Sequence, residues 1–373
     1  MDEQKLSLVV DRMYEAAARP ELWRPVLHEL AMVAGGQGAQ LLYHRPEGAA
    51  LHTASEGLDH VLDAFFREGW HIRNPREVRA RRRGVPLHEI VTDADLFTKE
   101  ELDREPWQKD FLDRFGLRWF ASFTAMPFDE IAPVFLTIER PAARNPFSRQ
   151  EIALLRTVVA HVQRASQLSL AVAAAKGAGM LDGLERMDRG AVLLDDLGRV
   201  VALNGSAERL LGRGLSVASS RLRAESRSAN EALQTLVTSV TAPPPFRGKP
   251  APDAVVVPRA NGRPIIVQAA PLVNSARDFF QQARALAILQ DLDQRPEPDP
   301  TLLQFAFGLT PTETRIGQAV ASGLRLTEIA AKLGVSVSTV RSHLKEVFAK
   351  TNTHSQSELA VLLNRMVGIG GGS

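Results

Sequence analysis

The stretch LTPTETRIGQAVASGLRLTEIAAKLGVSVSTVRSHLKEVFAKTNTHSQSELAVLLNR, residues 309–365, determines the fold expected at the C-terminal end of this chain. Thr310 is placed to cap a helix that has Pro311 in its first turn, and apolar residues then recur at helical spacing. Thr327 is placed to cap a second, short helix, and Gly334 supplies the left-handed residue that ends it. The pattern predicts two short helices followed by a tight turn.

The third predicted helix starts after Ser336 and separates its residues onto two faces. One stripe is apolar and consists of Val337, Val340, Leu344 and Val347. The opposite stripe carries small polar groups and long cations, namely Ser338, Arg341, Ser342 and Lys345. A helix in the major groove of DNA needs such a face, because small residues let the backbone approach while Arg and Lys reach guanine or phosphate. The hydroxyls of Ser338 and Thr339 suit phosphate oxygens, so the segment predicts a helix-turn-helix that binds double-stranded DNA.

The amphipathic pattern by itself also fits a small helical domain in which Arg341 and Lys345 form an ordinary solvated face. Local charge favours the DNA-binding interpretation, since residues 309–365 contain seven Lys and Arg against four Glu. The Gly-containing turn and the helix caps favour it as well.

The segments LTPTE, EIAAKLGVS and TVRSHLKEVFAKT resemble the LuxR-type helix-turn-helix, an all-α four-helix domain, over about fifty-five residues. The resemblance implies base contacts from Arg341, Ser342 and Lys345 and a backbone contact near Thr339. It also implies that the last helix, 357–365, mediates dimerisation through three apolar residues, which are Leu359, Leu362 and Leu363.

The length of 373 residues predicts two or three domains. With 45 Lys and Arg against 43 Asp and Glu, the whole-chain net charge of +2 does not by itself indicate nucleic acid. The absence of cysteine excludes disulfides and thiolate metal sites. No run approaches the ~20 apolar residues of a membrane span, so we expect a cytoplasmic protein without membrane contact.

Nothing in the sequence predicts an enzyme. We find no phosphate-binding Gly-rich loop, no paired histidines for a metal and no nucleophile elbow. We therefore expect no catalytic residues, no metal and no cofactor.

The N-terminal part alternates helical and strand patterns, which predicts an α+β layer domain. Helices are expected over two stretches of 4–34, over 58–66 and from Ser148 onward. Strands are expected at four places, namely 39–43, 50–54, 119–126 and 133–139, with a turn at 46–48 between the first two.

The segments FFREGWHIRNPREV and FLDRFGLRWFASFTAMPF resemble the ligand-binding domain of LuxR-type quorum sensors, which is related in shape to GAF domains. The resemblance covers roughly 58–165 and implies a sensor over 1–147 with a small-molecule effector. The family's Asp that accepts the amide of an acyl-homoserine lactone aligns with Asn74, and its lactone-holding Trp is absent near 86–88. A neutral amide accepts a weaker bond than a carboxylate, so we expect a different ligand.

An apolar pocket with Asn74 or His71 as its polar anchor would take a small, largely apolar effector. The residues predicted to line it are Phe66, Trp70, Asn74, Trp107, Phe111, Trp119 and Phe123. The alternative is an aromatic core without a ligand. The arginine-rich run 79–83 indicates a solvated helix end rather than a nucleic-acid patch.

Apolar residues recur at three and four from Ser148 to Ala175, which predicts a connector helix over 148–180. Such a helix favours a homodimer, although packing on its own domain is the alternative. We expect a second domain to begin near Gly177 and Gly179.

Residues 181–293 resemble an α+β PAS domain, with GAVLLDDLGRVVALNGSAERLL at the front and a hairpin about Asn261 and Gly262 near the end. The charged, Pro-rich linker 294–304 follows, and the helix-turn-helix domain is expected over 305–366.

The sequence as a whole predicts a transcription regulator whose sensor domains bind an effector and modulate DNA binding by a dimer. RNA polymerase is a further candidate partner. In the alternative, the GAF-like and PAS-like modules serve only dimerisation or protein interaction, without a ligand.

Overall fold

A computed structural model describes seven stretches of the chain, namely 3–44, 50–84, 89–126, 133–241, 252–272, 279–294 and 297–366. The turn expected at 46–48 and the segment 86–88 lie outside the described residues. The chain divides into two compact units. Unit 1 comprises Met1–Ala175 and Val273–Gln281, and unit 2 comprises Lys176–Leu272 and Gln282–Ser373.

Unit 1 is built on a five-stranded antiparallel sheet with strand order β2-β1-β5-β4-β3. Its strands are β1 (Gly38–His44), β2 (Ala50–Ala54), β3 (Val91–Thr92), β4 (Leu117–Met126) and β5 (Val134–Pro141). Its helices are α1 (Glu3–Ala18), α2 (Trp23–Val33), α3 (Asp59–Arg67), α4 (Pro75–Arg83), α5 (Asp93–Leu96), α6 (Lys99–Arg104) and most of α7 (Arg149–Arg186). Short turns of helix, η1 (Pro20–Leu22), η2 (Glu56–Leu58), η3 (Trp107–Phe111) and η4 (Leu112–Phe115), connect them. The α+β architecture and the predicted strands are confirmed.

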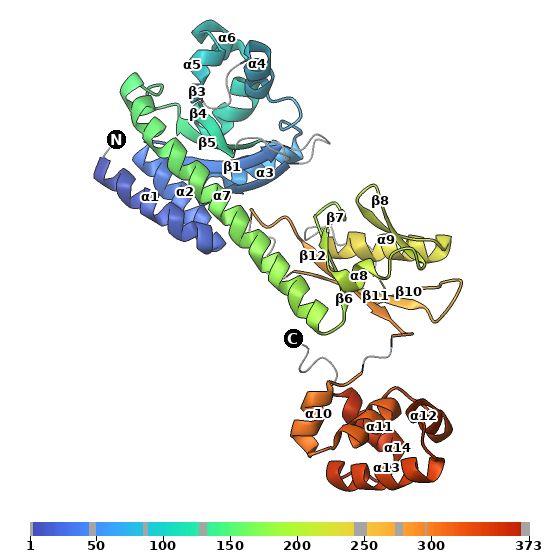
Figure 1. The fold of residues 1–373 in the computed structure, drawn as a ribbon. Helices are drawn as coiled ribbons and strands as arrows, with labels where there is room; N and C mark the ends of the chain where they lie inside the picture. The colour runs from blue at the N-terminus through green and yellow to red at the C-terminus, as the bar shows by residue number, and fades with distance from the viewer. Residues whose placement is uncertain are drawn as a thin grey trace. The chain divides into compact units, whose positions relative to one another are not determined.

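The two faces of this sheet bury different residues, because side chains alternate along a strand. Leu136, Ile138 and Phe123 belong to a core packed against α1, α2 and α7, on one face of the sheet in Figure 1. Phe120 and Glu139 are on the other face, where α4, α5 and α6 lie. The sheet therefore separates a large aliphatic core from a smaller aromatic one.

A buried group of charges ties α4 to the sheet. The Arg76 guanidinium donates to Asp93 through Nε at 3.0 Å and Nη2 at 3.2 Å, and to both Glu139 oxygens through Nη1 at 3.0 and 3.1 Å. Asp93 also accepts the backbone N–H of Phe120 at 2.8 Å. All three charged side chains are buried. Because two carboxylates share one guanidinium, the triad carries one excess negative charge when fully ionised.

Helix α7 begins where the sequence predicted. Ser148 and Glu151 cap it reciprocally, since Ser148 Oγ accepts from Glu151 N at 3.2 Å and Glu151 accepts from Ser148 N at 2.8 Å. The helix continues to Arg186, beyond the end of the connector expected over 148–180. Unit 2 begins within this helix at Lys176, near the glycines where a second domain was expected. A Cβ on Gly177 would lie 3.1 Å from Leu193 Cδ1, so the glycine permits close packing of the helix within unit 2.

The first part of unit 2 contains a second five-stranded antiparallel sheet with order β10-β11-β12-β6-β7. Its strands are β6 (Gly190–Leu194), β7 (Val200–Leu203), β10 (Val255–Val257), β11 (Ile265–Pro271) and β12 (Ala285–Asp291). The short helix α8 (Gly205–Glu208) follows β7. The sequence did not predict the three elements that come next, namely β8 (Leu215–Ala218), β9 (Arg221–Ala224) and α9 (Arg227–Thr241). Helix α9 contributes Leu233, Leu236 and Val237 to the core of this sheet.

The C-terminal part of unit 2 is a helical domain of five helices among the residues described. They are α10 (Pro300–Phe307), α11 (Pro311–Ala321), α12 (Leu326–Leu333), α13 (Val337–Thr351) and α14 (Gln356–Asn364). The sequence did not predict α10, which occupies part of the expected linker 294–304. Asp299 caps α10 and Leu303 is fully buried, so the folded domain begins earlier than expected.

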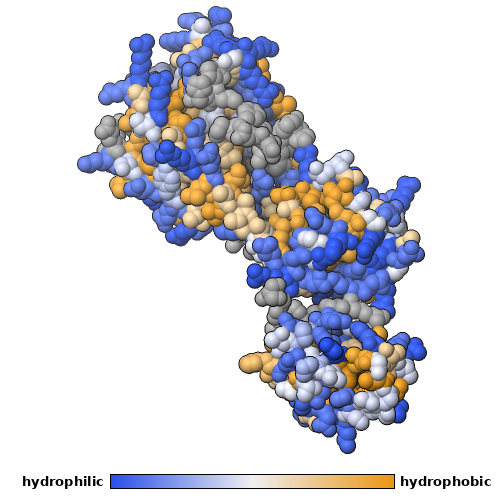
Figure 2. All heavy atoms as spheres, viewed as in Figure 1, coloured by the Kyte–Doolittle hydropathy of each residue, from blue (hydrophilic) through white to orange (hydrophobic). Residues whose placement is uncertain are grey.

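Figure 2 shows hydrophilic residues over much of the visible face of this helical domain, with hydrophobic residues between them. Across the described part of the chain, none of the helices combines the length and the apolar character that crossing a membrane requires.

The triad predicts a pH dependence of folding. Burial raises the pKa of Asp93 to about 6, and Arg76 only partly offsets that effect. A folded-state pKa above the unfolded value of 3.8 contributes stability at low pH, and this contribution is lost as pH rises through 6. Between pH 7 and pH 5 the free energy of unfolding should therefore gain about 1 kcal/mol from this group.

Chemical denaturation of the wild type and of Asp93→Asn at pH 5 and pH 7 checks this expectation. The stability difference between the two proteins should change by about 1 kcal/mol between the two pH values, whereas Asp11→Asn, an exposed control on α1, should show no such change. An equal difference at both pH values would contradict the assignment to Asp93.

Candidate nucleic-acid interface and a hollow in unit 1

Helix caps fix the three helices that build the candidate DNA interface. Thr310 caps α11 in a capping box with Glu313, as the sequence predicted. Gly334 ends α12 with φ 68°, and Ser336 Oγ caps α13 by accepting from Thr339 N at 3.1 Å. The start of α12 was misplaced, because the capping residue is Arg325 rather than Thr327. The Glu328 carboxylate accepts the Arg325 backbone N–H at 2.7 Å, which places the N-cap of α12 at Arg325.

One ion pair attaches the end of α13 to the start of α11. Lys350 Nζ lies 2.7 Å from Glu313 Oε2 and 3.1 Å from the Gly308 carbonyl oxygen. Burial of Glu313 acts to raise its pKa, but the bonds from Lys350 and Thr310 outweigh burial and lower the pKa. The cap of α11 and the orientation of α13 therefore depend on the same carboxylate.

Helix α13 has the two faces that the sequence predicted. Val340 and Val347 are fully buried, Leu344 is nearly so, and all three pack in the core of the domain. Helical geometry then directs the opposite residues outward. The five residues predicted to contact DNA are all exposed, and they are Ser338, Thr339, Arg341, Ser342 and Lys345.

The polar side chains on the exposed face of α13 differ in the hydrogen bonds that they already make within the chain. The hydroxyls of Ser338 and Thr339 interact with Ser336 Oγ at 2.7 and 2.8 Å, and Ser342 Oγ donates to the Ser338 carbonyl at 3.2 Å. Arg341 and Lys345 have no ion pair or side-chain hydrogen bond with any other described residue. Their N–H donors are therefore free to bind an external acceptor, such as a base edge or a phosphate oxygen of a nucleotide.

The packing of α14 changes the prediction for its leucines. Leu359 and Leu363 are fully buried in the core of their own domain, so in this conformation they have no surface for a second copy. Leu362 is half-buried and Val361 is 56% exposed, which leaves these two on the accessible face of α14. Gly317 explains the close packing, because a Cβ there would lie 3.2 Å from Leu363 Cδ1.

The seven residues expected to form an apolar pocket in unit 1 fall into separate places. Trp70, Trp107 and Phe111 pack together, with ring centroids 4.8 to 5.6 Å apart, and Phe66 borders the same cluster. Phe123 is on the other sheet face in the aliphatic core. These placements correct the single-pocket prediction, because the rings that do meet fill a core.

The two remaining predicted residues have structural partners. Asn74 caps α4, and its Oδ1 accepts the Arg76 backbone N–H at 3.1 Å. Trp119 donates its Nε1–H to the Arg144 carbonyl at 2.8 Å. The run 79–83 forms the end of α4, followed by Gly84 in the left-handed region, as expected.

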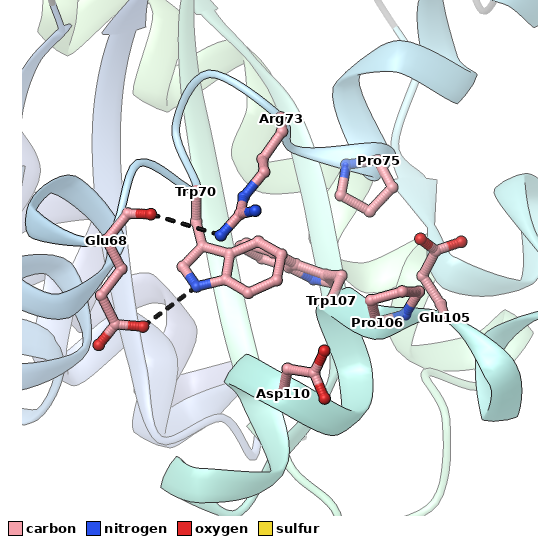
Figure 3. A pocket seen from close by; sticks show the side chains of 8 residues that line it. All are labelled: Glu68, Trp70, Arg73, Pro75, Glu105, Pro106, Trp107 and Asp110. Atoms are coloured by element: carbon pink, nitrogen blue, oxygen red, sulfur yellow. Dashed lines mark hydrogen bonds between the residues drawn. The ribbon is translucent and has the colours of Figure 1, made fainter.

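A hollow of about 510 Å³ lies beside the aromatic cluster. Trp70, Trp107, Pro75 and Pro106 supply apolar surface, and four charged residues complete the wall, namely Glu68, Arg73, Glu105 and Asp110 (Figure 3). Sequence reasoning identified only the two tryptophans. The charged residues carried no spacing signal, because they come from four places along the chain, namely the end of α3, the loop before α4, the end of α6 and η3.

No group of three or more His, Cys, Asp or Glu with the geometry of a metal site occurs among the residues placed in the structure.

The C-terminal domain matches a known family of DNA-binding domains. Residues 308–363 match the family described as bacterial regulatory proteins, luxR family. The C-terminal helices therefore form a luxR-family helix-turn-helix, a DNA-binding domain found in transcription regulation.

Part of the chain is similar in sequence to a known response regulator. The response regulator Rre1 of Synechocystis is 36% identical over 85 residues, which are 22% of this chain and 35% of Rre1. The chain thus matches about a third of the length of that relative.

Two solved structures resemble larger parts of the chain. The ligand-binding domain of VqsR from Pseudomonas aeruginosa has a TM-score of 0.36 and 15% identity, with coverage of 45% of this chain and 97% of that domain. SdiA from Escherichia coli has a TM-score of 0.31 and 12% identity, with coverage of 98% and 96%.

A DNA site for this test is first enriched from random duplexes. Replacing Arg341 by Ala should cost about 1 to 3 kcal/mol of binding free energy at that site, because a cation on the exposed face of α13 is lost. A gel shift at fixed salt measures this. Arg365→Ala removes the same charge just beyond α14 and should leave affinity nearly unchanged. Equal affinity of wild type and Arg341→Ala would contradict the proposed face.

Acyl-homoserine lactones should not raise the melting temperature of the full chain, since the Asn74 amide oxygen is already engaged by the Arg76 N–H. Differential scanning fluorimetry with lactones of short and long acyl chains checks this expectation. A concentration-dependent rise of several degrees would contradict it.

Proposed function

We propose that this chain is a transcription regulator in which α13 reads promoter DNA and unit 1 senses a small molecule. The observation that carries the proposal is the unpaired cationic face of α13, with Arg341 and Lys345 exposed opposite the buried Val340 and Val347. The family match over residues 308–363 supports the same conclusion independently.

We propose the domain division expected from the sequence, with a GAF-like sensor over 1–147, a connector helix over 148–180, a PAS-like domain over 181–293, a linker over 294–304 and the helix-turn-helix domain over 305–366. Two elements of the structure adjust its edges, because α7 extends to Arg186 and α10 starts at Pro300. The PAS-like assignment is supported by the sheet order β7-β6-β12-β11-β10. Helices α8 and α9 lie between β7 and β10 along the chain.

We propose that the regulator acts as a homodimer. Leu168 on α7 is 45% exposed and Val361 on α14 is 56% exposed, so both helices present apolar surface that a second copy would bury. An effector that binds one conformation of unit 1 more tightly would shift the population of dimers competent for DNA. A differential affinity of about 1 to 3 kcal/mol is enough for ordinary regulation. RNA polymerase would then be the partner of an activating form.

A second candidate is a regulator whose GAF-like and PAS-like modules serve only dimerisation or protein interaction. The packed rings of Trp70, Trp107 and Phe111 favour it, because they fill the space expected for an apolar ligand. Native mass spectrometry of protein purified from its own host separates the two candidates. A co-purifying small molecule supports the sensor, and its absence at full DNA-binding activity supports the second candidate.

Lys345→Ala tests the electrostatic part of the proposed function. Each phosphate contact by a Lys adds about 0.9 to the slope of log affinity against log salt, so the variant should bind more weakly and with a slope smaller by about 1. Fluorescence anisotropy of the full chain on labelled duplex DNA, measured from low to moderate salt, gives both quantities. A slope identical to that of wild type would show that Lys345 does not contact phosphate.

A further inference from the structure

The hollow beside Trp70 and Trp107 has a chemistry that the sequence did not indicate. Its floor is aromatic, since Trp70 and Trp107 lie with ring centroids 5.5 Å apart at 72°, and Pro75 and Pro106 flank them in Figure 3. Its wall carries three carboxylates, from Glu68, Glu105 and Asp110, which lie around the tryptophans in Figure 3. An aromatic face beside carboxylates is the combination that binds organic cations.

The hollow already holds one cation of the chain itself. The Arg73 guanidinium carbon lies 4.0 Å from the centroid of the Trp70 ring, and Arg73 Nη2 donates to the Glu68 carbonyl at 3.4 Å. Arg73 is exposed and this hydrogen bond is long, so the side chain is held weakly. The Trp70 face therefore accepts a cation from the solvent side and can release it.

The three carboxylates are not equally available. Glu68 accepts two bonds from Arg114 at 2.7 and 2.9 Å, and Arg114 lowers the pKa of Glu68. Glu105 lies 3.6 Å from Arg79. The carboxylate of Asp110 has no partner among the residues that the structure describes. Asp110 is thus the charge in the wall that remains for an incoming cation.

One of the two tryptophans that line the hollow also carries a buried donor without a partner among the described residues. Trp107 is only 3% exposed, and its indole Nε1 has no hydrogen-bond partner among the described residues. Buried indole N–H groups usually find an acceptor, and leaving one unpaired costs free energy. By contrast, Trp70 Nε1 donates to Glu68 at 3.2 Å and Trp23 Nε1 donates to Ser169 at 3.1 Å. The wall therefore lacks one acceptor.

We propose that this hollow binds a small organic cation that carries a neutral hydrogen-bond acceptor. The cation takes the place of Arg73 on the Trp70 face and pairs with Asp110, and the acceptor receives the Trp107 Nε1–H. The proposal rests on the sensor role proposed for unit 1 and replaces the largely apolar effector expected from the sequence. The ligand is then a molecule that carries an ammonium or guanidinium group with a carbonyl or hydroxyl oxygen nearby.

Acetylcholine is a suitable probe, because it joins a quaternary ammonium to an ester carbonyl. Its neutral isostere 3,3-dimethylbutyl acetate has the same shape without the charge. The chain has four tryptophans, so the indole N–H resonances of the ¹⁵N-labelled full chain can be assigned with single Trp→Phe variants. The Trp107 resonance should shift saturably with acetylcholine while that of Trp23, bonded to Ser169, stays constant.

Three comparisons complete the test. The neutral isostere should bind at least about fivefold more weakly, as expected for the loss of a cation–π contact and an ion pair. Trp107→Phe keeps an aromatic ring and removes the donor, so binding, followed in this variant by the Trp70 resonance, should weaken about threefold to tenfold. Asp110→Asn should also weaken binding several-fold, whereas Asp63→Asn, which removes an exposed charge outside the hollow, should not.

The proposal is overturned if acetylcholine produces no saturable shift of Trp107, or if the isostere binds as tightly as the cation. The same samples are assayed for DNA binding by anisotropy. Loss of the ligand result with intact DNA binding rejects this site and leaves the proposed regulator standing. Failure of DNA binding with a positive ligand result rejects the regulator and leaves the cation site standing.

Discussion

The packing of one stripe of α13 into the core of its domain is the constraint on which the functional account depends. Val340, Leu344 and Val347 are buried against α11 and α12, and this fixes the rotation of the helix about its own axis. Arg341 and Lys345 lie on the opposite side of this amphipathic helix and are exposed to solvent. The ion pair of Lys350 with Glu313 holds the end of the same helix, so apolar and ionic contacts enforce one orientation.

Unit 1 shows how the filling of a core decides which surface remains for a ligand. The side of the sheet that faces α4 is occupied by the Arg76, Asp93 and Glu139 triad and by packed aromatic rings. Breaking such a buried ionic group by removing one partner typically costs about 3 to 5 kcal/mol, because a charge is left uncompensated. The interior on that side of the sheet is therefore filled by groups that stabilise the fold. The hollow that remains beside Trp70 and Trp107 is bordered by carboxylates.

Sequence reasoning succeeded where local chemistry determines the outcome. The Ser336 cap, the Gly334 turn and the stripe of α13 follow from spacing alone, as do the cap of α7 and most strands of unit 1. It failed where distant residues decide. The sequence did not predict α9, although its Leu233 packs in the core of the second sheet. Leu303 becomes a core residue only because the rest of its domain covers it. The tryptophans were identified as a group, but neither their packing nor the arrival of Asp110 beside them can be read from spacing along the chain.

Selection of random double-stranded DNA by the full chain tests the central claim most directly, since it presumes no operator sequence. The account predicts enrichment of a defined sequence by the wild type and loss of that enrichment when Arg341 and Lys345 are both replaced by Ala. Recovery of no preferred sequence, or the same enrichment with both cations removed, would contradict the claim that the exposed face of α13 reads DNA.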